Sequence, residues 1–216
     1  ILSANSMNEF LPAHRALVNW ASKMPDREFL LQPVDGEIRC FTWKESADIS
    51  RRIASALGSM GLKPGDKVAI LAKNSAEWLL TDIAIAMAGM ISVPIYPTAS
   101  VQTIRYILEH SEASAVFIGK LDEPDVVADA IPVNLSSIAF PYPTVPCRYD
   151  WNSLIKKYPP IEVLPEPDPD DVMTILYTSG STGKPKGVVL SYRAYAYGSM
   201  AARDTVDVNT DDHLLS

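Results

Sequence analysis

Short apolar runs alternate with longer stripes of apolar residues along this chain. The runs have the length and β-branched content of strands and fall at 29–34, 37–41, 68–71, 91–96, 116–118, 138–140, 172–177 and 188–190. The stripes recur every three or four residues and predict helices near 12–24, 42–60, 75–87, 100–108, 125–130, 151–158 and 191–202. Because strands and helices alternate, the sequence predicts an α/β fold, a layered and mainly parallel sheet with flanking helices.

Local signals indicate where several of these elements begin and turn. Asp35 and Gly36 form a dipeptide typical of a tight β-hairpin. Thr42 followed by Glu45 matches the capping-box pattern of a helix N-terminus, and Ser75 can cap the next helix. Pro12 is expected at the first helical position of the first helix.

A polar loop separates the last two predicted strands. Its ten residues, 178–187, are all Gly, Ser, Thr, Lys or Pro. Glycines let neighbouring N–H groups face one concavity, hydroxyls can donate to phosphate oxygens, and lysines add positive charge. The candidate phosphate ligands are Thr178, Ser179, Gly180, Ser181, Thr182, Gly183, Lys184, Lys186 and Gly187. Since no carboxylate interrupts the loop, a phosphate is the expected ligand.

Two familiar phosphate-binding patterns do not fit this loop. Pro185 follows Lys184, where the G-x-x-x-x-G-K-[ST] loop requires Ser or Thr. The glycines also miss the G-x-G-x-x-G spacing of dinucleotide-binding folds. A mobile, polar hairpin connection without a ligand is the plainest alternative. The paired lysines among glycines and hydroxyls argue against it.

Composition and charge narrow the range of partners. The chain has 216 residues, 47% of them hydrophobic, and a net charge of -7, which disfavours nucleic acid as a partner. Its two cysteines and three histidines lack metal-ligand spacing, so we expect a cytoplasmic protein without structural disulfides. The longest uncharged apolar stretch, 83–96, is shorter than the ~20 residues of a membrane span. We expect no transmembrane segment, while peripheral membrane contact stays open.

Composition also divides the chain into parts. We interpret residues 1–6 as a remnant that precedes a native initiator, Met7. Residues 7–158 are expected to form an α/β subdomain, and 159–171 an acidic, Pro-rich, solvated connector. Residues 172–216 would then hold the strand, loop, strand and helix around the candidate site, truncated inside a further predicted strand.

The loop resembles the phosphate loop of the adenylate-forming, or AMP-binding, enzymes. The matching string at 177–188 is Tyr-Thr-Ser-Gly-Ser-Thr-Gly-Lys-Pro-Lys-Gly-Val. Other stretches resemble recurring pieces of the family's N-terminal region, in the same order, at 41–43, 65–70, 93–97 and 168–171. The resemblance covers nearly the whole chain. Residues 91–117 look most like bacterial long-chain fatty acyl-CoA synthetases.

This resemblance implies part of a large N-terminal domain that activates a carboxylic acid. The acid attacks the α-phosphorus of ATP to give an acyl-adenylate and pyrophosphate, and the thiol of coenzyme A then takes the acyl group. By position in the motif, the loop would neutralise the β- and γ-phosphates, with Lys186 as the catalytic lysine and Thr178 reaching Mg²⁺. A small carboxylic acid, ATP, Mg²⁺ and coenzyme A are therefore the expected partners.

Two alternatives stay open. One is another adenylate-forming activity, such as an amino-acid adenylation domain or an acyl-AMP ligase. The other is a non-catalytic nucleotide-binding module. The family's remaining elements would follow Ser216, so the chain is expected to be a fragment that catalyses neither half-reaction alone. Its sheet should expose an unpaired edge, which favours self-association.

Overall fold

The structure of the chain, a computed structural model, describes residues 11–179 and 183–206, without the side chains at 202–204 and 206. The helices are α1 (Ala13–Lys23), α2 (Trp43–Ser59), α3 (Ala76–Met87), α4 (Val101–His110), α5 (Pro124–Val127), the 3₁₀ turn η2 (Ala128–Ala130), α6 (Trp151–Lys157) and α7 (Tyr192–Val206). The strands are β1 (Glu28–Val34), β2 (Glu37–Thr42), β3 (Lys67–Ala72), β4 (Ile91–Ile95), β5 (Ala113–Gly119), β6 (Ser136–Ala139), β7 (Tyr149–Asp150), β8 (Val172–Thr178) and β9 (Lys186–Ser191). In this part of the chain no helix has both the length and the apolar character needed to cross a lipid bilayer.

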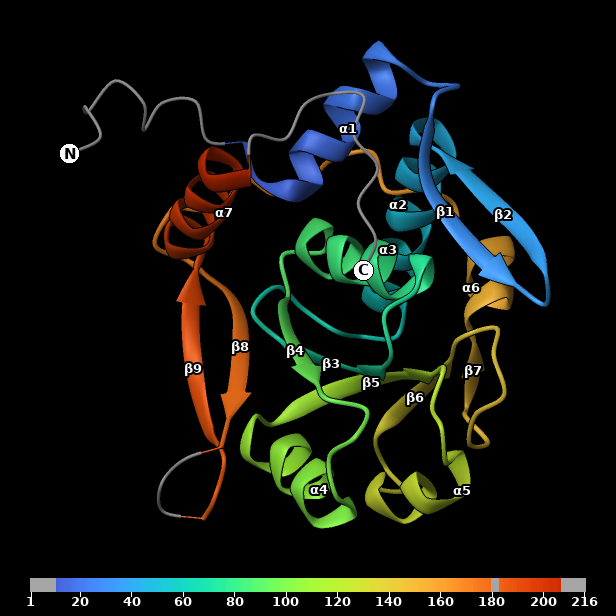
Figure 1. The fold of residues 1–216 in the computed structure, drawn as a ribbon, viewed down its shortest axis with the longest axis vertical. Coiled ribbons are helices and arrows are strands. Elements are labelled where there is room, and N and C mark those ends of the chain that lie inside the picture. Colours follow the sequence, from blue (N-terminus) through green and yellow to red (C-terminus); the bar gives the residue numbers. More distant parts are fainter. Residues whose placement is uncertain (1–10, 180–182, 207–216) are drawn as a thin grey trace.

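A seven-stranded sheet forms the centre of the molecule (Figure 1). Its strand order is β7-β6-β5-β3-β4-β8-β9, and every neighbouring pair is parallel except β8 and β9. β1 and β2 form a separate antiparallel hairpin. The predicted layered α/β sheet is confirmed. The short edge strand β7 was not predicted, because two residues carry no recognisable apolar pattern.

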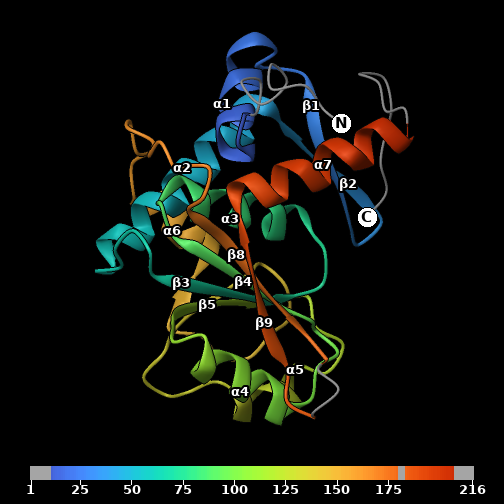
Figure 2. The ribbon, with the colours of Figure 1, turned by 90° about the vertical axis from the view of Figure 1, so that its left-hand side faces the viewer.

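Helices cover both faces of this sheet. Consecutive residues of β3 alternate between two cores: Val68 and Ile70 pack with α2 and α3, while Ala69 and Leu71 pack with α4. All four are fully buried. Figures 1 and 2 show α3 on one side of the sheet and α4 on the other. A central strand that is apolar at every position is typical of a parallel sheet with two covered faces.

Several elements begin where the local signals placed them. The side chain of Thr42 accepts a hydrogen bond from the Glu45 N–H at 3.2 Å, and Ser75 accepts one from the Trp78 N–H at 3.1 Å. Asp35 and Gly36 have φ values of 50° and 85°, which a tight hairpin turn requires. The first helix starts one residue later than predicted, because Pro12 is its N-cap.

The acidic connector is held against the helices and is not simply solvated. Arg15 of α1 donates to the carbonyl oxygens of Leu164 and Pro165 at 3.1 and 3.2 Å. Arg51 of α2 donates to the Ile161 carbonyl at 3.2 Å, and the Leu164 side chain is buried. Leu164 is the one buried residue of 159–171, so the segment is anchored there, while its other residues are at least partly exposed. The proposed division of the chain at this segment stays a prediction.

His14 of α1 is fully buried where α1 meets α7. Its ring lies edge-on to that of Tyr192, with centroids 6.1 Å apart. Burial, and next the positive charge of Arg15, lower the pKa of His14 from its usual 6.5. Burial favours the uncharged imidazole because the charged form loses its hydration. The neutral ring is therefore the form that this packing requires.

We expect the chain to lose stability as the pH falls below about 6.5. In that range the unfolded chain takes up a proton at His14 while the folded chain resists it, so the free energy of unfolding falls by at most ~1.4 kcal/mol per pH unit. Above the usual His pKa both states are neutral and the contribution is constant. Urea unfolding at a series of pH values measures the slope, and His14→Leu should remove this part of it. An unchanged slope in His14→Leu would contradict the assignment.

Candidate functional site

The β8–β9 hairpin brings the two ends of the predicted phosphate loop side by side. Thr178 is paired with Lys186 in the antiparallel register. Cross-strand partners project to the same face of a sheet. Both residues are exposed, so a hydroxyl and an ammonium group share one open face at the mouth of the loop.

The structure describes part of the loop itself. Gly180, Ser181 and Thr182 lie outside the described residues. Ser179 is exposed. Gly183 has a φ of 86°, and apart from its chain neighbours none of the described residues has an atom within 4 Å of where its Cβ would be. Gly183 therefore has a backbone conformation that glycine favours, which is compatible with the predicted loop.

Two lysines bring positive charge to the loop. Neither Lys184 nor Lys186 forms a salt bridge with a carboxylate in the described ranges. The Lys184 ammonium nitrogen lies 5.7 Å from the ring centroid of Tyr106, within cation–π range. Both cations are thus open to an incoming anion.

Gly187 is also constrained by packing. A Cβ at this position would lie 3.0 Å from Cγ2 of Ile175 and 3.2 Å from Cζ of Tyr177. Both neighbours belong to β8, and Tyr177 is the register partner of Gly187. The absence of a side chain at Gly187 therefore lets the Tyr177 ring lie against the β9 backbone, in addition to the proposed role of Gly187 in the loop.

Two α4 residues that the sequence analysis did not single out contact this hairpin. The Tyr177 hydroxyl and Nδ1 of His110 are hydrogen-bonded at 2.8 Å, and Tyr106 is the residue under Lys184. Burial, and next Tyr106, raise the pKa of Tyr177. Tyr106 and His110 are four residues apart, a spacing that places both side chains on one helix face. This spacing is the sequence feature from which the pair could have been predicted.

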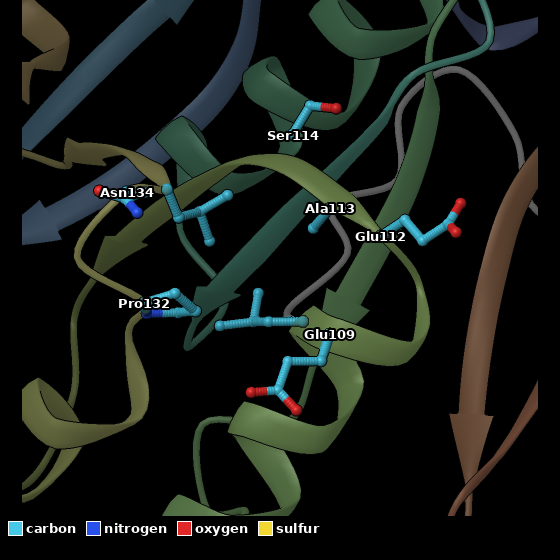
Figure 3. A pocket seen from close by; sticks show the side chains of 8 residues that line it. Glu109, Glu112, Ala113, Ser114, Pro132 and Asn134 are labelled. Atoms are coloured by element: carbon cyan, nitrogen blue, oxygen red, sulfur yellow. The ribbon is translucent and has the colours of Figure 1, made fainter.

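The position of the loop in the sheet also suits ligand binding. β8 runs parallel to β4, so the loop follows the carboxyl end of a strand in a parallel sheet, where ligands of such folds bind. A separate hollow of about 400 Å³ lies at the amino end of β5 and includes Glu109, Glu112, Pro132 and Asn134 (Figure 3). Its two carboxylates would repel phosphate, so we do not assign the nucleotide to it.

The chain resembles known proteins over most of its length. It matches the profile of the family described as AMP-binding enzyme over residues 17–216. It is 32% identical over 203 residues to the medium-chain-fatty-acid–CoA ligase of Ectopseudomonas oleovorans, covering 88% of this chain and 36% of that protein. It is 33% identical over 179 residues to fatty acyl-CoA synthetase A of Dictyostelium discoideum, covering 77% and 27%. The chain thus spans about a third of the length of these curated relatives.

The fold is shared with a solved structure of an anthranilate CoA ligase, AuaEII, in complex with anthranoyl-AMP. The TM-score is 0.79 at 21% sequence identity, over 92% of this chain and 38% of that one. At this identity the likeness shows the fold alone, and it agrees with the layered sheet described above. The family profile covers nearly all of the sequence, and on that ground the chain belongs to the AMP-binding enzyme family.

Proposed function

We propose that the β8–β9 loop binds the β- and γ-phosphates of ATP. The observation that carries the proposal is the pairing of Thr178 with Lys186 on one exposed face at the mouth of a glycine-rich loop. Membership of the AMP-binding family supports ATP as the nucleotide. The proposed ligands are the loop residues named from the sequence, 178–184 together with Lys186 and Gly187.

Charge explains why such a loop suits the activation of a carboxylate. A carboxylate attacking the α-phosphorus approaches a group that already carries several negative charges, so the barrier falls when those charges are neutralised. Lys186 starts β9, and the strand pair fixes the position of its backbone, from which its ammonium group extends. We therefore assign Lys186 the main electrostatic role and the loop N–H groups a supporting one.

Magnesium fits this site as a companion of the nucleotide. Among the described residues there is no group of three or more His, Cys, Asp or Glu side chains that could hold a metal ion. Mg²⁺ commonly binds through substrate phosphates and retains several waters. Thr178 is exposed beside Lys186, and we assign its hydroxyl as the contact of this chain with the ion. The bound ion would neutralise phosphate charge.

The acid is proposed to be a fatty acid, and coenzyme A the acceptor. The printed names of the two curated relatives, a medium-chain-fatty-acid–CoA ligase and a fatty acyl-CoA synthetase, support this choice. The sequence resemblance favours a long chain within that class. The two free cysteines, Cys40 and Cys147, accord with a reducing compartment such as the cytoplasm, which we propose as the location.

A substrate panel tests this function on the complete protein, expressed from the longest reading frame that contains the chain. Fatty acids of increasing length, aromatic acids and amino acids are supplied with ATP, Mg²⁺ and coenzyme A. Formation of AMP and a fatty acyl thioester is expected. Acyl-adenylate without thioester would indicate an acyl-AMP ligase, and exchange with amino acids an adenylation domain. Nucleotide binding without pyrophosphate exchange for any acid would indicate a non-catalytic module.

The chain alone is expected to catalyse neither half-reaction, because it spans about a third of its relatives. ATP–pyrophosphate exchange with the purified 216-residue chain measures this directly. No exchange above a protein-free control is expected with any acid on which the complete protein acts. Exchange by the chain alone would overturn the expectation.

Self-association through the sheet edge also stays a prediction. Among the described strands β9 pairs with β8 alone. Val188 and Val189 of β9 are 43% and 58% exposed. An edge strand with exposed valines can pair with a second chain, which is the physical basis for this expectation.

A further inference from the structure

Two residues of α4 lie against both limbs of the phosphate loop. On the β8 limb, the Tyr177 hydroxyl is 2.8 Å from Nδ1 of His110. On the return limb, the Lys184 ammonium nitrogen is 5.7 Å from the Tyr106 ring centroid. The rings of Tyr106 and His110 are themselves 5.1 Å apart. The two contacts therefore share one aromatic platform, made of Tyr106 and His110.

The platform stands on a rigid support. Ile104, Ile107 and Leu108 of α4 are at most 4% exposed and belong to the core that includes Tyr177. A close-packed core allows little displacement. The platform can therefore hold the two limbs in a fixed position relative to the sheet before any nucleotide arrives.

We propose that Tyr106 and His110 are positioning residues of the phosphate loop, an inference that rests on the proposed binding of ATP there. Ordering a loop on binding lowers affinity, and order established beforehand avoids that cost. His110 gives the hydroxyl of the buried residue Tyr177 a hydrogen-bond partner near the end of β8. Tyr106 lies under the ammonium group of Lys184 on the return limb. The platform thus acts on nucleotide binding through the loop.

If Tyr106 and His110 only stabilised the fold, replacing them would mainly lower the unfolding midpoint. His110 is exposed, and Tyr106 is partly exposed and packs against the margin of the core, so neither is a fully buried core residue. Tyr177, by contrast, is 6% exposed and packs in the core. Replacing a platform residue should therefore change the loop more than the global stability. The KM for MgATP is expected to change while kcat and the unfolding midpoint change little.

Matched variants of the complete protein test the hydrogen bond. His110→Phe keeps a ring but loses Nδ1, Tyr177→Phe loses only the hydroxyl, and His110→Asn places an amide near the position of Nδ1. A hydrogen bond of ordinary net strength corresponds to roughly 2- to 13-fold in affinity. His110→Phe and Tyr177→Phe should each raise the KM for MgATP by about that factor. The double variant should be no worse than either single one, and His110→Asn should restore most of the loss.

Trypsin cleavage of the nucleotide-free protein gives a readout independent of catalysis. Cleavage after Lys186 releases a peptide that begins at Gly187, which mass spectrometry identifies. This cleavage should accelerate in His110→Phe and in Tyr106→Leu, but not in Tyr106→Phe, which keeps the ring under Lys184. The rate reports how often the β8–β9 limbs open, whether or not ATP binds.

The outcomes separate the two proposals. If wild-type protein is active and neither the KM nor the cleavage rate changes in the variants, the positioning role is overturned and the proposed function stands. If the unfolding midpoint and kcat fall while the KM is unchanged, the platform is structural and the inference is again overturned. If cleavage accelerates as expected but no form of the protein binds MgATP, the positioning contacts are supported and the proposed function fails.

Discussion

Replacing Lys186 with alanine is expected to lower the adenylation rate of the complete protein about 100- to 1,000-fold, the effect of removing one well-placed charge donor from a transition state. That loss corresponds to about 2.7–4 kcal/mol of transition-state stabilisation. The expectation follows from position: Lys186 opens β9, faces the same side as Thr178, and forms no salt bridge with a described carboxylate. ATP–pyrophosphate exchange under saturating acid measures the rate.

Two further lysine variants serve as controls. Lys156→Ala removes an exposed lysine of α6, away from the loop, and should leave the rate within about twofold, as a distant surface change does. Lys184→Ala should act mainly on nucleotide affinity. Lys184 contacts the Tyr106 ring, and this contact is proposed to position the loop before the nucleotide binds. The unfolding midpoint of Lys186→Ala should match wild type, since the side chain is exposed. A normal exchange rate in a folded Lys186→Ala protein would remove this residue from the mechanism.

Replacing Gly119 with alanine is expected to destabilise the fold by about 1–3 kcal/mol or more, the usual range for overpacking a core. A Cβ at Gly119 would lie 2.6 Å from the Cβ of Phe140 and 3.4 Å from its Cα. These atoms belong to or adjoin the backbone, so the contact cannot be relieved by rotating a side chain. Phe140 is itself enclosed, 1% exposed and edge-on to Trp151 at 6.3 Å.

Gly58 provides a matched control of opposite sign. It lies in α2, and apart from its chain neighbours and the helix's own backbone no described residue has an atom within 4 Å of where its Cβ would be. Gly58→Ala should therefore stabilise the fold by up to ~1 kcal/mol through helix propensity. Urea unfolding of both variants gives the two free energies. Equal stability of Gly119→Ala and wild type would mean that the segment carrying Phe140 shifts at no cost.

Features encoded within a few residues were predictable. Asp35-Gly36, the Thr42 and Ser75 caps and the apolar runs of the sheet act through neighbouring atoms, so their outcome depends little on the remainder of the fold. The anion-binding role of the loop at 178–187 also rests on local composition, and it stays a prediction. The acidic connector shows where this logic fails. Its charges indicated solvent, while Leu164 and the arginines of two helices anchor it.

The sequence by itself determined the alternation of strands and helices and the family, because both are encoded in contiguous stretches, and from the same kind of signal it predicts the chemistry of the loop. The tertiary structure alone decided which residues of other elements contact that loop and its flanking strands. His110 and Tyr177 are separated by 67 positions in the chain, and Gly119 meets Phe140 on another segment. Such pairs come into contact only once the strands are arranged in the sheet. The strand order cannot be predicted from local composition, so these contacts could not be predicted from it either.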